Sequence, residues 1–246
     1  MSLKPHIESL ARLIHAGKVT FFSGAGMSTA SGLPDFRSAE NGLWGKIDPM
    51  KVASSRCLEK NYDQFHAFYK MRLNQLVGIE PNAGHHFISR MEKAGKVVGV
   101  ITQNVDGLHE AAGSVNIATL HGRLREIRCE HCTSPSTIPA FENGSSCEKC
   151  GGHLRPGVVL FGESLPSEAL RLADTWTNSC QTFIVLGSSL RVSPANSFPE
   201  IAKRRGANLV IINAEPTECD SMADLVIHDP IVEVFEETEK AMKLLE

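Results

Sequence analysis

The 246-residue sequence has no apolar run long enough to cross a membrane, since a spanning helix needs about 20 apolar residues. Its longest apolar stretches are short, and the run from Val97 to Ile101 is typical of them. The segment from Met1 to His15 has a polar residue at every second or third position, so it lacks the apolar region of a secretory signal. We therefore expect a cytoplasmic protein with no membrane partner.

The sequence also lacks a strong excess of either charge. It has 25 Lys and Arg against 28 Asp and Glu, a net charge of −3, and this near-balance argues against a stable nucleic-acid partner. Hydrophobic residues make up 42% and charged residues 22%, which is typical of a globular chain and excludes disorder and coiled coil. We expect a monomer with one elaborate domain or two unequal ones.

The seven cysteines do not form an even set for disulfides, but four of them lie in two Cys-x-x-Cys pairs. The pairs are Cys129 with Cys132 and Cys147 with Cys150. Four thiolates spaced in this way predict a closed tetrahedral site for one structural Zn²⁺. Unmetallated thiols and a nucleic-acid-binding ribbon are the alternatives, and the acidic residues within the segment weaken the second.

Short apolar runs alternate with segments of helical periodicity, which predicts a parallel sheet covered by helices on both faces. The expected strands are 19–22, 97–102, 182–186 and 209–212, and the expected helices are 7–15, 65–76, 84–93, 167–176, 199–205 and 232–245. Residues 34–75 and 128–156 break the alternation and read as insertions that form a smaller lobe. The fold class is therefore α/β, a doubly wound, Rossmann-like parallel sheet with a smaller inserted domain.

A glycine-rich turn follows the first expected strand, where a phosphate-binding loop would lie. Gly24 and Gly26 would let the backbone approach a pyrophosphate, and a helix starting near Met27 would direct its amides toward it. The third glycine, Gly32, comes later than in the usual dinucleotide motif, so a tight turn without a ligand is the alternative. The loop that follows contains Asp35-Phe36-Arg37, which suggests a lid over a nucleotide rather than a solvated turn.

Polar residues follow two further strands at the edge where α/β sheets bind ligands. Gln103, Asn104 and Asp106 come after the strand 97–102, although helix capping would account for some of them. His121 ends the apolar run 117–120, which is where a general base would be placed. A structural histidine is the alternative at that position.

Taken together and in order, these motifs resemble the sirtuins, NAD⁺-dependent protein-lysine deacylases. The residues that carry the resemblance run through nearly the whole chain: Gly24-Ala25-Gly26-Met27-Ser28, Gly32 to Arg37, Thr102 to Asp106, His121-Gly122, the cysteine quartet, Gly157 to Glu163, Gly187 to Leu190, and Asn213-Ala214-Glu215. The resemblance implies a Rossmann-like NAD domain of residues 1–34, 90–124 and 157–246. It also implies a small domain in which residues 35–89 hold the cofactor loop and a helical module, and residues 125–156 hold the zinc module.

The resemblance also implies a role for each set of site residues. Those expected to hold the phosphates are Gly24, Ala25, Gly26 and Ser28. Those expected in the flexible cofactor loop are Asp35, Phe36 and Arg37. Those expected at the nicotinamide riboside end are Gln103, Asn104 and Asp106, and those expected at the adenosine end are Gly187, Ser188, Ser189, Asn213 and Glu215. Those expected to pair with an acyl-lysine peptide are Val159, Phe161 and Gly162.

The implied chemistry transfers an acyl group from lysine to ADP-ribose and releases nicotinamide. His121 would act as the general base and Asn104 would also take part in catalysis. The alternatives are a mono-ADP-ribosyltransferase, which would use the same activated sugar, and a non-catalytic NAD-sensing zinc adaptor, which would have no use for a base.

One further motif concerns the acyl group. Tyr69 and Arg72 are three positions apart on an expected helix and therefore share a face. Sirtuins that remove succinyl or malonyl groups carry Tyr-x-x-Arg at the corresponding place, where the hydroxyl and guanidinium can bind the distal carboxylate. An ordinary pair on the helix surface is the alternative.

Overall fold

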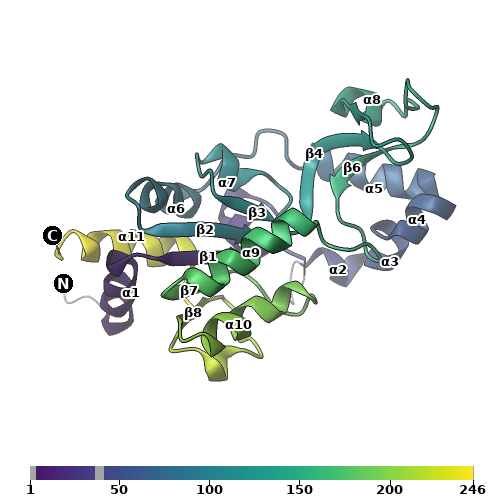
Figure 1. Cartoon of the computed structure of the whole chain (residues 1–246). Coiled ribbons are helices and arrows are strands. Elements are labelled where there is room, and N and C mark those ends of the chain that lie inside the picture. Colours follow the sequence, from purple (N-terminus) through teal and green to yellow (C-terminus); the bar gives the residue numbers. More distant parts are fainter. Residues whose placement is uncertain (1–3, 37–41, 246) are drawn as a thin grey trace.

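The computed structural model describes residues 4–36 and 42–245, and its larger lobe is built on a six-stranded parallel sheet (Figure 1). The strand order is β3-β2-β1-β7-β8-β9. The bounds are β1 Val19–Ser23, β2 Val97–Thr102, β3 Ile117–Thr119, β7 Thr182–Leu186, β8 Asn208–Ile212 and β9 Leu225–Ile227. The order runs outward in both directions from the β1–β7 pair, which confirms the doubly wound fold.

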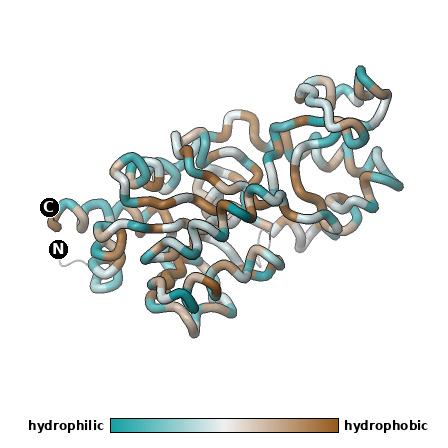
Figure 2. The backbone as a smooth tube through the Cα atoms, viewed as in Figure 1, coloured by the Kyte–Doolittle hydropathy of each residue, from teal (hydrophilic) through white to brown (hydrophobic). Residues whose placement is uncertain are grey.

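Helices cover both faces of this sheet, as its strand sequences require. Side chains alternate between faces along a strand, so neighbours such as Phe21 and Phe22 enter different cores. One core is shared with α1, α6 and α11, and the other with α9 and α10. The bounds of these helices are α1 Pro5–Ala16, α6 Ala83–Lys93, α9 Ser167–Ser179, α10 Phe198–Arg204 and α11 Ile231–Met242. Figure 2 shows the hydrophobic colour following the central strands, while the outer helices alternate in hydropathy.

The turn after β1 differs in detail from its prediction. In place of an α-helix starting near Met27, the chain forms a 3₁₀ helix, Ala25–Ser31, that ends at Gly32 in the left-handed region. The tighter winding lets residues Gly24 to Gly26 lie directly against the loop that follows β7. The edge strand β9 was not predicted, because it has only three residues, of which two are half-buried.

The smaller lobe combines short helices with an antiparallel sheet in the order β5-β4-β6. The bounds of its elements are α2 Leu43–Lys46, α3 Pro49–Val52, α4 Ser55–Lys60, α5 Tyr62–Asn74, β4 Gly122–Cys129, β5 Pro135–Ser136, α8 Ile138–Glu142 and β6 Leu154–Val158. Within residues 34–75 a helix was expected only from residue 65, so α2, α3 and α4 were not predicted. The ladder between β4 and β6 was not predicted because its strands hold few apolar residues.

The two insertions share one apolar core, since Phe65 and Tyr69 of α5 lie in the same buried cluster as Phe141 and Leu154 of the cysteine-rich segment. Helix α7 (Leu108–Ala111) lies between β2 and β3, and the two residues Leu120 and His121 then connect β3 to β4 of the smaller lobe, which lies at the right of Figure 1. Helix α6, by contrast, packs on the sheet through Phe87, so the boundary expected at residues 89 and 90 falls inside a helix of the larger lobe. Among the described residues, no helix is long and apolar enough to span a membrane.

Candidate active site

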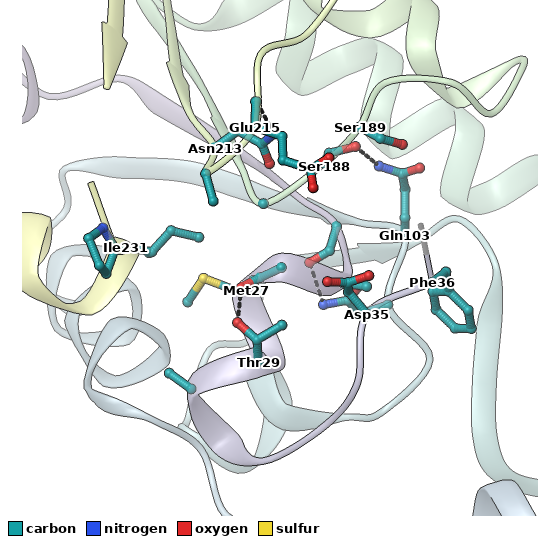
Figure 3. Close-up of a pocket in the computed structure, with 18 of the residues that line it drawn as sticks. Met27, Thr29, Asp35, Phe36, Gln103, Ser188, Ser189, Asn213, Glu215 and Ile231 are labelled. Carbon is teal, nitrogen blue, oxygen red and sulfur yellow. Dashed lines mark hydrogen bonds between the residues drawn. The ribbon is translucent and has the colours of Figure 1, made fainter. Parts of the chain in front are cut away.

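A cavity of about 380 Å³ opens at the carboxyl ends of β1 and β7, where the strand order reverses. This is the place where doubly wound sheets bind ligands, and the volume lies in the range of small-molecule sites. The cavity is lined by thirteen of the residues predicted from the sequence: Gly24, Ala25, Gly26, Asp35, Phe36, Gln103, Asn104, His121, Gly187, Ser188, Ser189, Asn213 and Glu215. Figure 3 shows several of these side chains, among them Gln103, Phe36 and Asn213, around the cavity.

Three glycines bring the two loops beneath the cavity into contact. A Cβ atom on Gly24 would lie 2.7 Å from the carbonyl oxygen of Gly187, and one on Gly26 would lie 2.8 Å from the Gly187 Cα. Gly187 itself has a φ of +58°, and a Cβ there would lie 2.4 Å from the backbone of Gly26. The glycines are therefore required by the packing of one backbone on the other, whatever ligand they also approach.

The backbone N–H groups in these loops divide into those that are used and those that are free to bind a ligand. Gly24 N–H donates to the Leu186 carbonyl and Gly26 N–H to the Gly187 carbonyl, each at 2.9 Å. Within the described part of the chain, the N–H groups of Ala25, Ser188 and Ser189 have no hydrogen-bond partner. Converging unpaired amides at a cavity wall form a site for an anion such as a phosphate.

Asn104 is held from behind by a polar network. Its side-chain NH₂ donates to the Gly24 carbonyl at 2.9 Å and to Ser28 Oγ at 3.2 Å. Ser28 in turn donates to Asp106 Oδ2 at 2.7 Å, while Asp106 Oδ1 accepts from Leu108 N–H at 3.0 Å. Ser28 and Asp106 therefore lie behind the cavity wall and fix Asn104, whose amide oxygen is left to accept a hydrogen bond.

His121 is held in one tautomer by the strand end beside it. Its Nδ1 lies 2.9 Å from the carbonyl oxygen of Gln103, and a carbonyl can only accept, so Nδ1 carries the proton. In the neutral ring the other nitrogen, Nε2, then keeps its lone pair, which is the form a general base needs. The Gln103 side chain turns the other way and donates to Ser188 Oγ at 2.8 Å, which joins the β2 and β7 loops (Figure 3).

The predicted lid and acyl-specificity residues meet at one wall of the cavity. Asp35 and Phe36 line it, whereas Arg37 lies outside the described residues. The Arg72 guanidinium carbon lies 5.0 Å from the centre of the Phe36 ring, in a cation–π contact. Neither Arg72 nor Tyr69 lines the cavity; both are buried in α5, and Arg72 is the one that contacts Phe36.

The far end of the cavity includes residues that the sequence analysis missed. Asn213 donates to the Glu215 carbonyl at 2.6 Å, and His228 Nδ1 lies 2.7 Å from the Asn213 carbonyl. The loop from His228 into α11 also lines this end, through Asp229 and Ile231. Its signal in the sequence was a polar His-Asp-Pro step directly after the short apolar run of β9.

The predicted peptide-binding segment follows β6 and is already tied to both lobes. Val159 N–H donates to the His121 carbonyl at 2.9 Å, and Phe161 N–H donates to the Ala53 carbonyl at 2.9 Å. The Phe161 carbonyl accepts from Ser55 N–H at 3.0 Å. Among the described residues, the Val159 carbonyl and the Gly162 N–H have no partner, so both can still form a backbone hydrogen bond.

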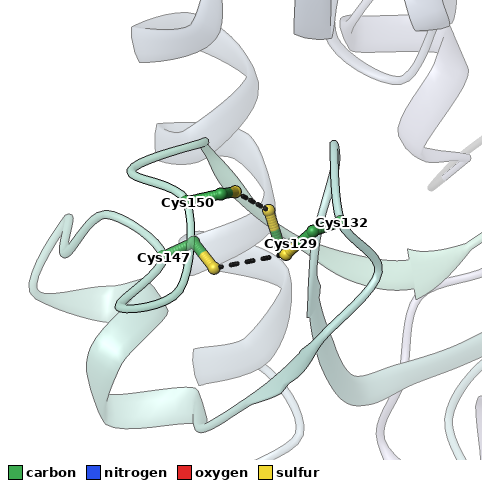
Figure 4. A group of neighbouring side chains, drawn as sticks. All are labelled: Cys129, Cys132, Cys147 and Cys150. Carbon is green, nitrogen blue, oxygen red and sulfur yellow. Dashed lines mark hydrogen bonds between the residues drawn. The ribbon is translucent and has the colours of Figure 1, made fainter.

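The four cysteines of the two Cys-x-x-Cys pairs come together at the end of the smaller lobe (Figure 4). Their sulfur atoms all lie within 4.8 Å of one another; Cys129 and Cys150 are 3.5 Å apart, and Cys132 and Cys147 are 3.6 Å apart. A tetrahedral zinc with bonds of about 2.3 Å requires sulfur separations of about 3.8 Å. The quartet is therefore poised to bind one Zn²⁺ ion, with no position left for a catalytic water.

Comparison with known proteins agrees with this architecture. Residues 24–194 match the Sir2 family. An NAD-dependent protein deacetylase of Oceanobacillus iheyensis is 47% identical over 215 residues, which cover 87% of this chain and 91% of the relative. One from the archaeon Sulfolobus acidocaldarius is 45% identical over 223 residues and covers 87% and 85%.

Solved structures give the same result. A chain from work on the mechanism and regulation of Sir2 enzymes has a TM-score of 0.90 and 38% identity, covering 98% of this chain and 99% of its own. A Sir2 variant in complex with a deacetylated p53 peptide and 3'-O-acetyl ADP-ribose has a TM-score of 0.90 at 34% identity, covering 95% and 97%. A Sir2 homologue in complex with NAD has a TM-score of 0.89 at 36% identity, covering 97% and 95%.

Proposed function

This chain belongs to the Sir2 family, and from that premise we propose that it is an NAD-dependent protein deacylase that transfers the acyl group of a modified lysine to ADP-ribose. The observation that carries the proposal is the convergence of three elements in one cavity. Unpaired amides from Ala25, Ser188 and Ser189, the oriented amide of Asn104 and a histidine with Nδ1 protonated all face the same space. A protein that only sensed NAD would not need such a base.

The roles of the binding residues follow from their contacts. The unpaired amides receive the pyrophosphate, Asn213 and Glu215 take the adenosine end, and Gln103 and Asn104 take the nicotinamide riboside end. Ser28 and Asp106 act by holding Asn104 rather than by contact from the cavity wall. Phe36 excludes water from the sugar carbon at which nicotinamide leaves.

Bound NAD⁺ supplies an activated ribose that loses nicotinamide and accepts the oxygen of the acyl group. His121 Nε2 takes the proton of a ribose hydroxyl, which then attacks the acyl carbon, and the Gln103 carbonyl stabilises the charged ring through Nδ1–H. The lysine amine leaves with that proton, and one water molecule supplies the oxygen that frees the acyl group as its ester with ADP-ribose. Val159 and Gly162 provide a carbonyl and an N–H that hold the substrate backbone as an added strand.

Incubation with NAD⁺ and an acetyl-lysine peptide tests the proposal, with the products identified by mass. We expect nicotinamide, free lysine peptide and O-acetyl-ADP-ribose, and a fall in kcat of about 10²–10⁴-fold for His121→Ala without loss of the fold. His228→Ala is the matched control, since this histidine lines the opposite end of the cavity and should affect the KM for NAD⁺ instead. ADP-ribosylated protein without an acyl product would indicate a transferase, and near-normal deacylation by His121→Ala would refute the base.

We also propose that the protein works as a monomer. Its thiolate quartet requires reduced cysteines, which supports a cytoplasmic location. We also propose the division into an NAD-binding lobe and a smaller lobe, with α6 assigned to the former because Phe87 packs on the sheet.

Tyr69 and Arg72 favour acidic acyl groups as additional substrates. Within the described residues, Arg72 is 8% exposed yet forms no ion pair, and its one hydrogen bond goes to Gln75 at 3.3 Å. Burial lowers the pKa of Arg72, while the nearby Tyr69 and Asp106 act to raise it, so a cation is held where little water reaches it. The Tyr69 hydroxyl likewise has no hydrogen-bond partner in the described part of the chain. A buried cation and an unused hydroxyl on one helix face fit a carboxylate.

Kinetics with acetyl and succinyl peptides test this assignment. We expect Arg72→Ala and Tyr69→Phe to lower kcat/KM for the succinyl peptide at least about tenfold more than for the acetyl peptide. Tyr69→Phe removes only the hydroxyl and serves as the conservative probe. A parallel fall on both substrates would assign Arg72 a structural role beneath Phe36.

A further inference from the structure

Arg155 in β6 is a charged side chain in the interior of the smaller lobe. It is 1% exposed and is the largest fully buried side chain in the described part of the chain. Its guanidinium donates five hydrogen bonds: Nη1 to Glu130 Oε2 at 3.0 Å, Nη1 to Glu163 Oε1 at 2.5 Å, Nη2 to Glu163 Oε2 at 2.9 Å, Nη2 to the Val158 carbonyl at 2.7 Å, and Nε to the Pro156 carbonyl at 3.3 Å. A buried guanidinium is tolerated only when it is paired and hydrogen-bonded to this extent.

The two carboxylates that bind Arg155 come from different parts of the lobe. Glu130 lies between Cys129 and Cys132, inside the first cysteine pair. Glu163 ends the segment that follows β6 and meets Arg155 through both of its oxygens, in the two-pronged geometry that only arginine offers. The guanidinium therefore connects the first cysteine pair, called the knuckle below, to residues 159–163.

Glu163 also forms hydrogen bonds with the backbone of Leu160. Its Oε2 also accepts from Leu160 N–H at 2.9 Å, and its own N–H donates to the Leu160 carbonyl at 3.0 Å. Burial alone would raise the pKa of Glu163, but hydrogen bonds from Arg155 and from the Leu160 N–H lower it, so the carboxylate stays charged. Glu163 therefore holds both the N–H and the carbonyl of Leu160. The neighbouring residues, Val159 and Phe161, form backbone hydrogen bonds to His121 and to Ala53.

We infer that Arg155 is a positioning residue for the peptide substrate: through Glu163 it fixes the shape of residues 159–163, and through Glu130 it ties that shape to the cysteine quartet. The inference rests on the proposed function, which assigns the free carbonyl of Val159 and the free N–H of Gly162 to the peptide backbone. An added strand forms only if those groups keep their register, so the clamp sets peptide affinity. Within the described residues, the side-chain hydrogen bonds of Arg155 and Glu163 join them to each other, to Glu130 and to the backbone of residues 156–160.

Steady-state kinetics of Glu163→Gln test the inference. The amide keeps the size of the side chain but loses the charge and one acceptor for Arg155. We expect the KM for an acyl peptide to rise about tenfold, while the KM for NAD⁺ and kcat change less than about threefold. Glu168→Gln is the matched control, because Glu168 forms a similar two-pronged pair with Arg171 on the exposed surface of α9, and we expect wild-type constants.

Arg155→Lys separates positioning from simple charge. Lysine keeps the charge but cannot bind both oxygens of Glu163 and the Val158 carbonyl together, so we expect the same rise in peptide KM as in Glu163→Gln. Unchanged peptide KM in both variants, or an equal loss for both substrates, would overturn the inference. A wild-type protein without acyl-dependent nicotinamide release would instead overturn the proposed function, so the two failures are distinguishable.

Hydrogen exchange tests the connection to the metal and does not depend on turnover. In the zinc-loaded protein, Glu130→Gln should speed amide exchange at Leu160, with β1 and β7 unaffected. Glu130 is partly exposed, so this variant breaks the link while the buried guanidinium keeps its hydrogen bonds to Glu163. Exchange at Leu160 identical to wild type would show that the knuckle and the segment are independent.

Discussion

The larger lobe lines most of the cavity, and α5 of the smaller lobe contacts Phe36 at the cavity wall through Arg72, but different interactions stabilise the two lobes. In the larger lobe, β1 and β7 are buried at every position, and two apolar cores lie on the two faces of the sheet. In the cysteine-rich part of the smaller lobe, Cys150 is exposed, Arg155 is buried among carboxylates, and β4 is buried at only three of its eight positions. The larger lobe is stabilised by apolar burial that is spread over many side chains. The cysteine-rich part of the smaller lobe, called the ribbon below, depends on a few polar and metal-binding groups.

This difference implies that one lobe can lose its structure while the other keeps it. Loss of one apolar contact in the sheet removes a small part of a large sum, so the sheet tolerates it. Loss of one sulfur or one carboxylate in the ribbon removes a group that several others need. The comparison therefore predicts which changes abolish activity while the dinucleotide site remains.

Removing the metal should give the largest effect. Cys147→Ser takes one sulfur from the quartet, and structural zinc sites supply about 10–16 kcal/mol of apparent binding energy to the folds around them. We expect zinc content below the detection limit and deacylase activity reduced more than about 100-fold, because the peptide segment is tied to the ribbon. ADP-ribose binding, measured by calorimetry, should remain.

Cys219→Ser is the control for this experiment, since Cys219 lies in the larger lobe, beside the core formed with α9 and α10. It should retain both zinc and activity. If Cys147→Ser also lost ADP-ribose binding, the two lobes would have to be regarded as one cooperative unit.

Gly187→Ala tests the close contact between the loops that follow β1 and β7 in the larger lobe. The new Cβ would lie 2.4 Å from the backbone of Gly26 at a φ of +58°, and backbone cannot move aside as a side chain can. We expect a loss in unfolding free energy at least about 2 kcal/mol greater than for Gly206→Ala, which has a similar positive φ but open space around it. Urea denaturation measures both, and equal losses would show that the loops separate freely.

The sheet and the site could be predicted from the sequence for one physical reason. Strands buried on both faces are continuous apolar runs, and the polar residues directly after them must lie at the ligand-binding edge. His121 and Asn104 were found in this way, and the cysteine quartet from its spacing alone.

The ribbon sheet and Arg155 could not be predicted, because their stabilising partners are remote in sequence. Arg155 is bound by Glu130, which lies 25 positions away, and a lone arginine in a sequence is expected at the surface. In β4, Arg123 pairs with Glu110 of α7, and Arg125 donates to the Leu76 carbonyl after α5. Periodicity of apolar residues carries no information about such contacts.

The larger lobe also contains buried polar groups, and they should make its unfolding free energy depend on pH. His85 and His109 lie fully buried with their rings 4.9 Å apart, and His109 Nε2 lies 2.8 Å from Ser23 Oγ. Burial, together with the neighbouring His109, lowers the pKa of His85 to about 2, and burial lowers the pKa of His109. Both rings therefore stay neutral in the folded protein at pH values where they are protonated after unfolding.

The sign of the effect follows from proton uptake. Below pH 6.5, the ordinary pKa of histidine, the unfolded chain binds protons that the folded protein excludes, so the unfolding free energy decreases as the pH falls. Each buried histidine contributes a slope of up to about 1.4 kcal/mol per pH unit below that value. We expect His85→Asn to flatten the slope between pH 6.5 and 5 by about one such contribution, as measured by urea denaturation.

His86→Asn provides the comparison for that slope, because His86 is exposed on the same helix. It should leave the pH dependence of wild type unchanged. Equal flattening in both variants would mean that burial of His85 has no part in the acid sensitivity.

The smallest effect is expected where a polar contact lies on the surface of the larger lobe. Arg171 and Glu168 form a two-pronged ion pair much like that between Arg155 and Glu163, with hydrogen bonds of 2.8 and 2.6 Å, but both side chains are more than 60% exposed. Water solvates the separated charges almost as well as the pair does, so Arg171→Met should leave the thermal midpoint within the error of calorimetry. Arg155→Met, by contrast, would leave two half-buried carboxylates without their cation and should lower the midpoint by several degrees (about 2–4 °C for each kcal/mol lost). Since the two pairs share their geometry, a similar shift in both variants would show that burial is not what gives the ribbon its dependence on polar contacts.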